Sequence, residues 1–369
     1  MYSEVKRGSV ENRQLLIDSL DSVFRPGNVQ GSSMALEFPH LFSDDNIENT
    51  FYIDDGKIPV SQASVLLSKT CINGAILDVA SLGSVSTMKD HRHKGLSTKI
   101  INRMIEVYRN SEIDLLLVSG EIELYTKLGC VKTGSDYSAV IEKIGKNEDI
   151  EQNGKYFVKL SSPEERIANA VEYHRIHIKE KFRYMRTSKE FSILLNALWF
   201  KRNGFRMDLF EIRNENETIL AYVVAFKKIG DSKLKIMEYA GSRKAIASCL
   251  LDIMAKMECS EIRFRVNEED FNFIEELSRL NVKLVQENSQ GTLKILNSQS
   301  IFRKLRPLII ERIGEYFEFR EIGNEKWLFI SGSLKKEING YDDLTHFIFD
   351  KKEGSLGIPL MFTDDLNYI

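Results

Sequence analysis

The chain has 369 residues, of which 43% are hydrophobic, enough for two or three globular domains with buried cores. Its formal net charge is −3 at pH 7, so no overall positive field would attract nucleic acid. No run of about 18 apolar residues is present, which argues against a membrane-spanning helix. The polar opening of the chain does not resemble a signal peptide, and we expect a cytoplasmic protein.

The cysteines and histidines predict neither a disulfide framework nor a metal site. The four cysteines are scattered and contain no Cys-x-x-Cys motif, which is typical of reduced thiols in a core. His174 and His177 have helical spacing, but no carboxylate motif adjoins them, so we interpret them as residues on the surface of a helix.

The first region begins with helical patterns and continues with strands. Residues 10–23 have helical periodicity and residues 34–42 predict a second short helix. Strands at 50–53 and 60–67 flank the hairpin signal Asp54-Asp55-Gly56-Lys57. The apolar run at 72–87 predicts a long strand, in which Asn73-Gly74 is either a turn or a bulge.

A basic loop and an amphipathic helix follow this strand. Leu96, Ile100 and Met104 repeat at helical spacing after the loop. The first-turn amides of a helix lack intrahelical partners and lie at the positive end of its dipole, so they can bind phosphate. Gly95 would let the backbone approach such a ligand closely. The alternative is a solvated basic turn, and the absence of a Walker-type motif argues against nucleoside triphosphate binding.

The end of the first region also has a strand and a helix. The run at 114–118 predicts a buried parallel strand. Glu121 and Glu123 suit the start of a helix, and Gly129 suits its C-terminal cap. Residues 137–144 predict a last strand of this region.

The second region repeats this order and the third is shorter. In the second we predict helices at 164–179, 189–198, 244–257 and 270–277, and strands at 206–212, 219–226, 234–239 and 261–266. The third has a helix at 301–315 interrupted by Pro307, then strands at 316–322, 326–331 and 332–335. The chain ends in an apolar stretch at 358–369.

Two motifs resemble those of one enzyme family. Arg92-x-x-Gly95-x-Ser97 after a long strand is similar to the acetyl-CoA signature of the GNAT acetyltransferases, although Ser97 replaces the last small residue. The stretch from Tyr125 to Cys130 resembles an element near the end of GNAT domains. Residues 342–349 resemble part of sterol-carrier-like domains. In layout, the chain resembles the "enhanced intracellular survival" tandem-GNAT acetyltransferases.

This resemblance implies an α/β (α+β) fold with two GNAT-like mixed-sheet domains and a small C-terminal domain. We predict a GNAT domain at 1–147, a degenerate GNAT-like domain without its own cofactor at 148–296, and a sterol-carrier-like domain at 297–369. For the second region, the alternative is an unrelated α/β domain. The resemblance allows a homo-oligomer, because the family includes hexamers.

The reaction implied is acetyl transfer from acetyl-CoA to a primary amine, without a metal. The acceptor would be an aminoglycoside-like molecule, a polyamine or a lysine side chain, and no nucleic acid or membrane partner is implied. The acetyl-CoA contacts carried over from the family are Val85, Ser86, Thr87, Arg92, His93, Lys94, Gly95, Leu96, Ser97, Thr98, Gly120 and Glu121. The acidic residues near the expected acceptor side, which would suit a cation, are Glu37, Asp44, Asp45 and Glu48.

Two residues have implied catalytic roles. Tyr125 would protonate the leaving thiolate, because a phenol keeps its proton at neutral pH; the alternative is a core residue of its helix. The α-carboxylate of Ile369 would act as the base, and Glu121 or Glu123 acting through water would be the next choice; the alternative is that the tail only packs on its own domain.

Two other function classes remain open. One is another tandem-GNAT acyl or aminoacyl transferase, such as a mycothiol synthase or a tRNA-dependent peptidoglycan transferase. The latter would be expected to have a basic face for tRNA, whereas this chain is acidic overall. The other class is a non-catalytic CoA-binding protein.

Overall fold

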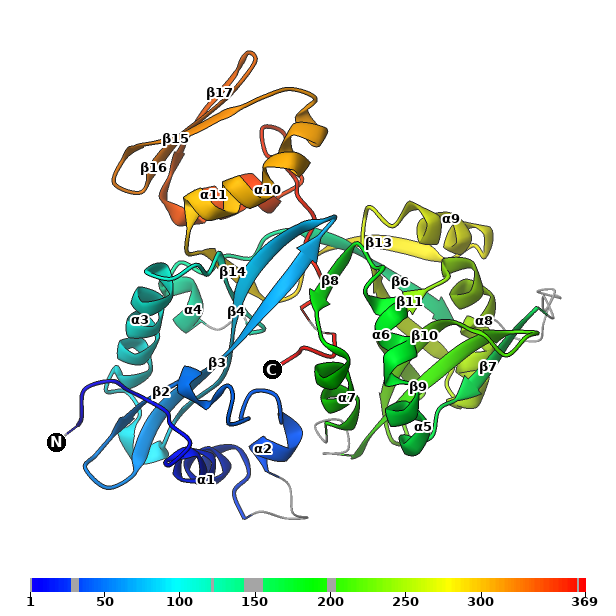
Figure 1. Cartoon of the computed structure of the whole chain (residues 1–369), viewed down its shortest axis with the longest axis horizontal. Coiled ribbons are helices and arrows are strands. Elements are labelled where there is room, and N and C mark those ends of the chain that lie inside the picture. The colour runs from blue at the N-terminus through cyan, green and yellow to red at the C-terminus, as the bar shows by residue number, and fades with distance from the viewer. Residues whose placement is uncertain (1, 28–32, 121–122, 143–154, 198–203, 364) are drawn as a thin grey trace. The chain divides into compact units, whose positions relative to one another are not determined.

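The computed structural model describes residues 2–27, 33–120, 123–142, 155–197, 204–363 and 365–369. Their contacts group into two compact units (Figure 1). Unit 1 contains Met1–Gly134, Ser289–Thr363 and Tyr368–Ile369, and unit 2 contains Ser135–Asn288 and Asp364–Asn367. The predicted domain boundaries at 147 and 296 stay a prediction about folding domains.

The first sheet of unit 1 has the strand order β1-β2-β3-β4-β5-β14. Neighbouring strands are antiparallel except β4 and β5, which are parallel. The elements of this part are β1 (Lys6–Arg7), α1 (Arg13–Phe24), α2 (Met34–Glu37), β2 (Thr50–Asp54), β3 (Pro59–Ile72), β4 (Ala75–Thr87), α3 (Leu96–Arg109), β5 (Leu115–Val118), α4 (Glu123–Lys127) and β14 (Thr292–Ile295).

The long hairpin β3–β4 is the centre of this sheet. Asn73 and Gly74 form its turn, with φ of 45° and 94°, which resolves the turn-or-bulge alternative. The helix predicted at 34–42 is shorter than expected, because α2 ends at Glu37. On one face of the sheet, Ile100, Met104 and Tyr108 of α3 are buried in a core with Val65 and Leu116.

The remainder of unit 1 is a small layer of helices and strands. It contains α10 (Ser298–Ile313), β15 (Glu318–Gly323), β16 (Lys326–Ser331), β17 (Leu334–Asn339) and α11 (Gly340–Phe349). The three strands form an antiparallel sheet, on which Phe302 of α10 stacks against Phe319 and Phe347 of α11 packs on Phe329. The predicted interruption at Pro307 is wrong. Pro307 has no N–H group to donate to the Arg303 carbonyl. Both residues are exposed, so water can replace the lost hydrogen bond.

A buried charge cluster joins α10 to the first sheet. Lys304 Nζ lies 2.6 Å from Asp114 Oδ2 and 2.7 Å from Asp78 Oδ2. The Asp114 side chain is fully buried and also accepts a hydrogen bond from the Asp78 amide. Because a buried carboxylate needs a partner, this lysine fixes α10 against β4.

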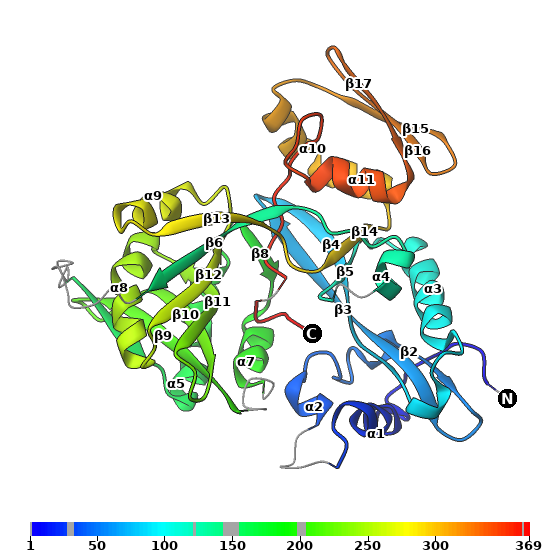
Figure 2. The same ribbon diagram turned by 180° about the vertical axis from the view of Figure 1, so that it is seen from behind.

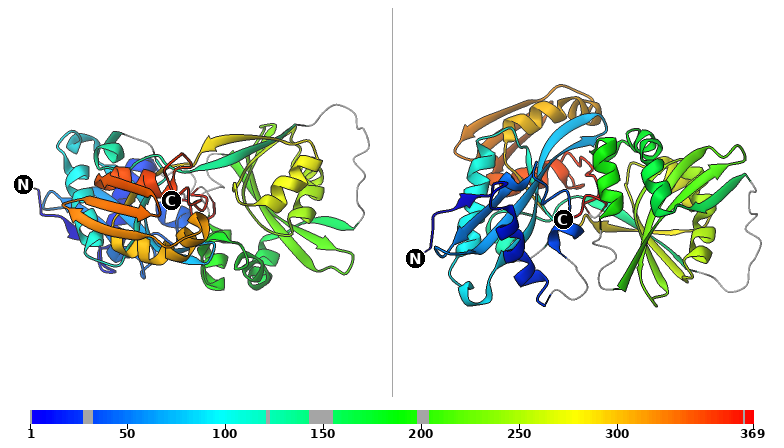
Figure 3. Two further views of the ribbon diagram at one scale, coloured as in Figure 1. Left: turned by 90° about the horizontal axis from the view of Figure 1, so that it is seen from above. Right: turned by 60° about the horizontal axis from the view of Figure 1, so that its bottom comes forward.

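Unit 2 is built on a sheet with helices on both faces (Figure 3). Its strand order is β13-β6-β12-β11-β10-β9-β7. Along β10, Ala221, Val223 and Ala225 lie in one core with α8, and Tyr222 and Val224 lie in another core with residues of α6 and α7. This alternation matches the period of two that a strand imposes. The elements are β6 (Ser135–Glu142), β7 (Tyr156–Leu160), α5 (Pro163–Ala168), α6 (Ala170–His177), β8 (Phe182–Met185), α7 (Ser188–Asn196), β9 (Phe205–Asn214), β10 (Ile219–Lys228), β11 (Lys233–Gly241), α8 (Arg243–Lys256), β12 (Glu261–Val266), α9 (Phe271–Arg279) and β13 (Lys283–Asn288).

Some sequence predictions for this part are wrong in detail. The strand predicted at 137–144 exists as β6, but it pairs with β12 and β13 in the second sheet, and β14 takes the place next to β5 in the first (Figure 2). The helix predicted at 164–179 is broken into α5 and α6 at Asn169. The fold class itself is confirmed: two mixed sheets and a small C-terminal antiparallel sheet. Within the described ranges, no helix is long and apolar enough to cross a membrane.

Candidate functional site

The end of β4 and the start of α3 form the centre of the candidate site. Gly95 has φ of 71° and ψ of 10°, the left-handed conformation that favours glycine, and its carbonyl accepts the first helical bond from Lys99. Among the described residues, no side chain caps the first turn of α3. A Cβ atom built on Gly95 meets nothing within 4 Å. The amide end of this 14-residue helix is therefore open to an anion.

The loop before α3 is basic and exposed, and its ends are held by hydrogen bonds. Arg92 Nε donates to the Thr87 carbonyl at 3.1 Å, and the Thr87 and Ser97 hydroxyls lie 2.7 Å apart. Lys94 Nζ donates to the Tyr2 hydroxyl at 3.0 Å, which lies 2.9 Å from His91 Nδ1. These contacts link the basic side chains of the loop to the end of β4 and to the start of the chain.

The edge of β4 becomes unpaired on the β5 side just before this loop. Leu82 is the last β4 residue paired with β5, opposite Val118. On the β3 side the register shifts between Gln62 and Ser64, so β4 carries an extra residue, and Ser84 there has φ of 53°. Such bulges re-aim backbone groups near active sites. Val85 belongs to the bulge, and Ser86 and Thr87 follow it. The backbone of these three residues lies on an edge without a β5 partner.

Tyr125 follows the end of β5, the strand that runs parallel to β4. It is a buried residue of α4, and its ring would contact a Cβ atom built on Gly120 at 3.2 Å. Burial, and to a lesser extent Cys130, raises the pKa of the Tyr125 phenol above its ordinary value of 10.0. The phenol is therefore protonated at neutral pH and can donate a proton. Glu121 lies outside the described residues, and Glu123 is exposed and ion-paired with Lys127.

Ile369 lies against the unpaired part of β4. The residue is buried, with 8% of its surface exposed. A Cβ atom built on Gly83 would lie 3.2 Å from the carbonyl carbon of Ile369. Gly83 is the residue after Leu82, so Ile369 lies where β4 separates from β5.

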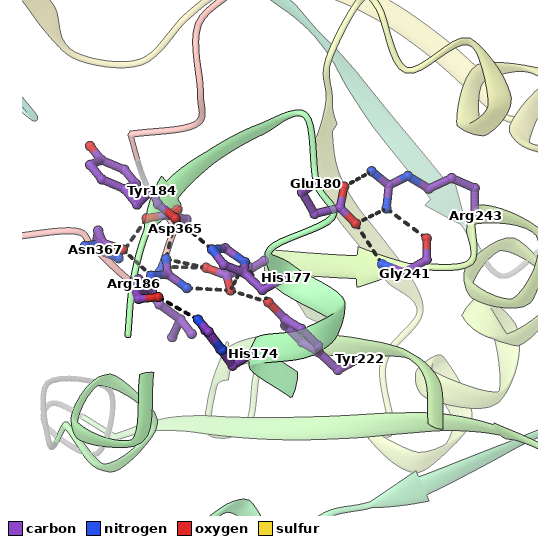
Figure 4. A network of polar contacts seen from close by, with 12 residues as sticks. His174, His177, Glu180, Tyr184, Arg186, Tyr222, Gly241, Arg243, Asp365 and Asn367 are labelled. Carbon is purple, nitrogen blue, oxygen red and sulfur yellow. Dashed lines mark hydrogen bonds and ion pairs between the residues drawn. The ribbon is translucent and has the colours of Figure 1, made fainter. Parts of the chain in front are cut away.

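The corresponding turn in unit 2 already holds a carboxylate (Figure 4). The Gly241 amide donates to Glu180 Oε1 at 2.8 Å, and Arg243 Nη1 donates to the same oxygen at 3.0 Å. The Ser242 hydroxyl accepts from the Ala245 amide and caps α8. The groups that could hold a phosphate after β11 are thus used by the protein's own side chains.

A buried network in unit 2 holds residues 365–367, and no sequence pattern predicted it (Figure 4). Arg186 donates to both oxygens of Glu238 at 2.9 Å, to Asp365 Oδ2 at 3.2 Å and to Asn367 Oδ1 at 2.5 Å. Its side chain is 1% exposed. His174 and His177 lie on α6 beside it, and His177 is buried rather than on a helix surface as we expected. Only the fold brings Arg186 next to residues about 180 positions away in the chain.

The acidic residues expected on the acceptor side divide into two groups. Glu37 is buried and ion-paired with Arg25, so it is already neutralised. Asp44, Asp45 and Glu48 are exposed, and Asp44 Oδ1 lies 3.4 Å from Arg13 Nε. Within the described ranges, no group of three or more His, Cys, Asp or Glu residues could hold a metal ion.

Comparison with known proteins agrees with this geometry. Residues 5–132 match the model of an acetyltransferase (GNAT) domain. No curated protein sequence gives a significant match to this chain.

Several solved structures have a similar fold over nearly the whole chain. A probable N-acyltransferase from Enterococcus faecalis has a TM-score of 0.64 at 12% identity, covering 94% of this chain and 89% of its own. A GCN5-related N-acetyltransferase from Anabaena variabilis has a TM-score of 0.64 at 14% identity, with coverages of 92% and 86%. Eis1 from Mycobacterium abscessus has a TM-score of 0.61 at 9% identity, with coverages of 97% and 96%.

The unpaired end of β4, the open amide end of α3 and the match over residues 5–132 agree with one another. Residues 5–132 therefore match a GNAT acetyltransferase domain, and the chain shares the fold of Eis1 and of the probable N-acyltransferase over nearly its whole length.

Proposed function

We propose that this protein transfers the acetyl group of acetyl-CoA to a primary amine. The observation that carries this proposal is the uncapped first turn of α3, preceded by a basic loop and followed along the chain by the protonated Tyr125. GNAT proteins use an acyl-CoA donor; acetyl as the acyl group is part of the proposal.

The donor would be held by the protein's backbone and basic side chains. The amides of residues 93–98 and the Arg92 guanidinium would bind the pyrophosphate, because the helix end is positive and Gly95 leaves room. The amides of Val85, in the bulge, and of Ser86 and Thr87, after it, would donate to the thioester carbonyl oxygen, where negative charge develops. Gly120 and Glu121 would contact the donor through their backbone.

The transfer needs two proton movements. The amine nitrogen forms a bond to the thioester carbon, and the carbon–sulfur bond breaks. A base takes the proton that the amine loses, and Tyr125 gives its phenolic proton to the leaving thiolate. The raised pKa of Tyr125 supports this role, since the group arrives protonated.

In a chain that ends at Ile369, the α-carboxylate of this residue would be the base. A Cβ atom built on Gly83, two residues before Val85 in β4, would lie 3.2 Å from the carbonyl carbon of Ile369. A free α-carboxyl group has a pKa of about 3.3–3.7, so it would accept the proton directly only if burial raises that value, and otherwise through water.

The test uses the full chain, acetyl-CoA and a panel of amines: an aminoglycoside, a linear polyamine and a lysine peptide. Release of CoA thiol is followed with a thiol reagent, and the acetylated amine is detected by mass. All four cysteines are buried, so the protein itself should contribute little signal. We expect thiol release and acetylated amine in equal amounts with at least one amine class. Acetyl-CoA binding without amine-stimulated thiol release would instead identify a non-catalytic CoA-binding protein.

The role of Ile369 is tested by a chain extended beyond this residue by a short Gly-Ser tag. The extension converts the carboxylate into a peptide group, so transfer should be lost while acetyl-CoA binding stays. Full activity of the extended chain would remove Ile369 from the mechanism and leave Glu121 or Glu123, acting through water, as the base.

A further inference from the structure

A glycine lies where β4 separates from β5. Gly83 is buried and pairs with Ser64 of β3. It follows Leu82, the last residue paired with β5, and precedes Ser84, which has the positive φ of the bulge. Glycine inside a strand often marks a place where another backbone approaches closely.

The backbone of Gly83 does not itself require glycine. Its φ lies outside the left-handed range, unlike those of Gly95 and Gly291 in the same unit. An alanine could therefore adopt the same backbone conformation without strain. The reason for glycine must come from what surrounds it.

Ile369 packs directly against Gly83. The three atoms nearest to a Cβ built on Gly83 all belong to Ile369: Cγ1 at 3.1 Å, and the carbonyl carbon and Cβ at 3.2 Å. These distances are shorter than ordinary contacts between carbon atoms. Any side chain at this position would push the end of the chain away from β4.

We propose that Gly83 is a positioning residue. Because it has no side chain, Ile369 can pack directly against the backbone of β4, and we call this space at Gly83 the seat of Ile369. The seat fixes the carbonyl carbon of Ile369, and with it the carboxylate, beside the edge of β4 where the thioester carbonyl would bind. This inference rests on the proposed role of Ile369 as the base. It assigns to Gly83 a function that neither a strand nor a bulge requires.

The main variant is Gly83→Ala. It should displace Ile369 by a few tenths of an ångström, so turnover should fall by about tenfold or more while acetyl-CoA affinity stays unchanged, because small misplacements of a reacting group are costly. Gly83→Val should lower turnover further. The control is Gly323→Ala in β15, because Gly323 has no left-handed φ and a Cβ there would meet only Lys326 side-chain atoms at 3.7 Å. This control should behave as wild type.

A compensating substitution makes the test specific. Ile369→Gly removes the Cβ and Cγ1 atoms that would be crowded, so Gly83→Ala combined with Ile369→Gly should recover activity relative to Gly83→Ala alone. A double-mutant cycle then measures the coupling between the two positions. A purely structural effect of alanine in β4 would be additive with Ile369→Gly, and additivity would overturn the proposal.

Release of Ile369 by a carboxypeptidase gives a readout independent of catalysis. In wild type and Gly323→Ala the buried residue should be removed slowly, and in Gly83→Ala about tenfold faster. Equal release rates for Gly83→Ala and Gly323→Ala would contradict the proposed positioning role of Gly83. This assay does not require the acceptor amine to be known. Full activity of the extended chain would overturn the proposed base but leave this protection assay valid, so the two failures are distinguishable.

Discussion

At the residue scale, the environment of Tyr125 decides its chemistry. A phenol exposed to water titrates near pH 10, and burial moves the pKa of Tyr125 further up. The phenol therefore keeps its proton across the whole physiological pH range. A structural tyrosine in the same core would show the same shift, so the pKa alone does not distinguish the two roles.

Tyr125→Phe separates them. If Tyr125 protonates the thiolate, turnover should fall on the order of 100-fold, the usual cost of losing a general acid, with acetyl-CoA affinity unchanged. The matched control is Tyr108→Phe, which removes a hydroxyl that donates to Asn49 Oδ1 from the same core, on α3. Equal turnover of Tyr125→Phe and Tyr108→Phe would show that Tyr125 only packs in the core.

His177 is the residue whose titration should affect the stability of unit 2. Its Nε2 lies 2.9 Å from the Tyr184 carbonyl oxygen and so donates to it, and Nδ1 lies 3.1 Å from the Tyr222 hydroxyl. Burial, followed by the positive charge of Arg186, lowers the pKa of His177 from 6.5 to about 4, although Glu238 acts in the opposite direction. The folded protein therefore keeps this imidazole neutral under conditions in which the unfolded chain binds a proton.

The sign of the pH effect follows from linkage. Between the two pKa values the unfolded state binds more protons, so the free energy of unfolding should fall as pH decreases through this window. We expect a loss of about 2 kcal/mol between about pH 7 and about pH 5. Glu238, whose pKa is lowered to about 2, adds its loss only below its ordinary value of 4.5.

Urea unfolding of wild type and His177→Gln at the two pH values checks this expectation. Glutamine cannot take up a proton, so the variant should lose most of this pH dependence. His93→Gln changes an exposed histidine and should keep the wild-type difference. If His177→Gln also keeps it, another group is responsible.

For helices and strands, the sequence pattern predicted the individual elements but not which distant strands pair with each other. The long strand, the basic loop and the amphipathic helix were predicted because their periods and turn residues lie within about 35 consecutive positions. The pairing of β6 with β12 and β13 was not predicted. A strand pattern shows which residues are buried, but not which sheet the strand joins. The short β8, β13 and β14 were missed for lack of a strong alternating pattern.

The same limit applies to the site. The α3 turn was predicted from Arg92, Gly95 and Ser97, and Tyr125 and Ile369 from resemblance. Gly83 and Arg186 had no local signal, since a glycine in a strand and an arginine beside a threonine are common. Their roles depend on segments far along the chain, Ile369 for the first and Asp365 and Asn367 for the second.

The two helix starts also differ in a way that bears on stoichiometry. In unit 1 the first turn of α3 has no side-chain cap among the described residues. In unit 2 the Ser242 hydroxyl caps α8, and Glu180 occupies the amide of the preceding Gly241. One donor site per chain is therefore expected, and it is the one in unit 1.

At the scale of the whole molecule, the C-terminal layer is part of unit 1 rather than an appendage. Lys304 of α10 forms ion pairs with both Asp78 of β4 and the fully buried Asp114 just before β5. Residues 289–363 and 368–369 belong to the same compact unit as the candidate site. The likeness to Eis1 covers 97% of the chain, so this arrangement belongs to the shared fold. The relation of residues 297–369 to sterol-carrier-like domains stays a prediction.

If the start of α3 holds the acyl donor, a change in its first turn should weaken acetyl-CoA binding, which calorimetric titration measures. The decisive variant is Gly95→Glu, which places a carboxylate at the proposed pyrophosphate position. Gly314→Glu is the control, because Gly314 has nearly the same backbone, φ of 73° and ψ of 7°, and equally open surroundings at the end of α10. Both variants therefore carry the same backbone strain.

We predict that the wild-type protein and Gly314→Glu bind one acetyl-CoA per chain with equal affinity, and that Gly95→Glu binds it at least about tenfold more weakly, because the new charge repels the pyrophosphate at close range. Equal affinity of Gly95→Glu and Gly314→Glu would contradict the account and remove the α3 turn from the donor site.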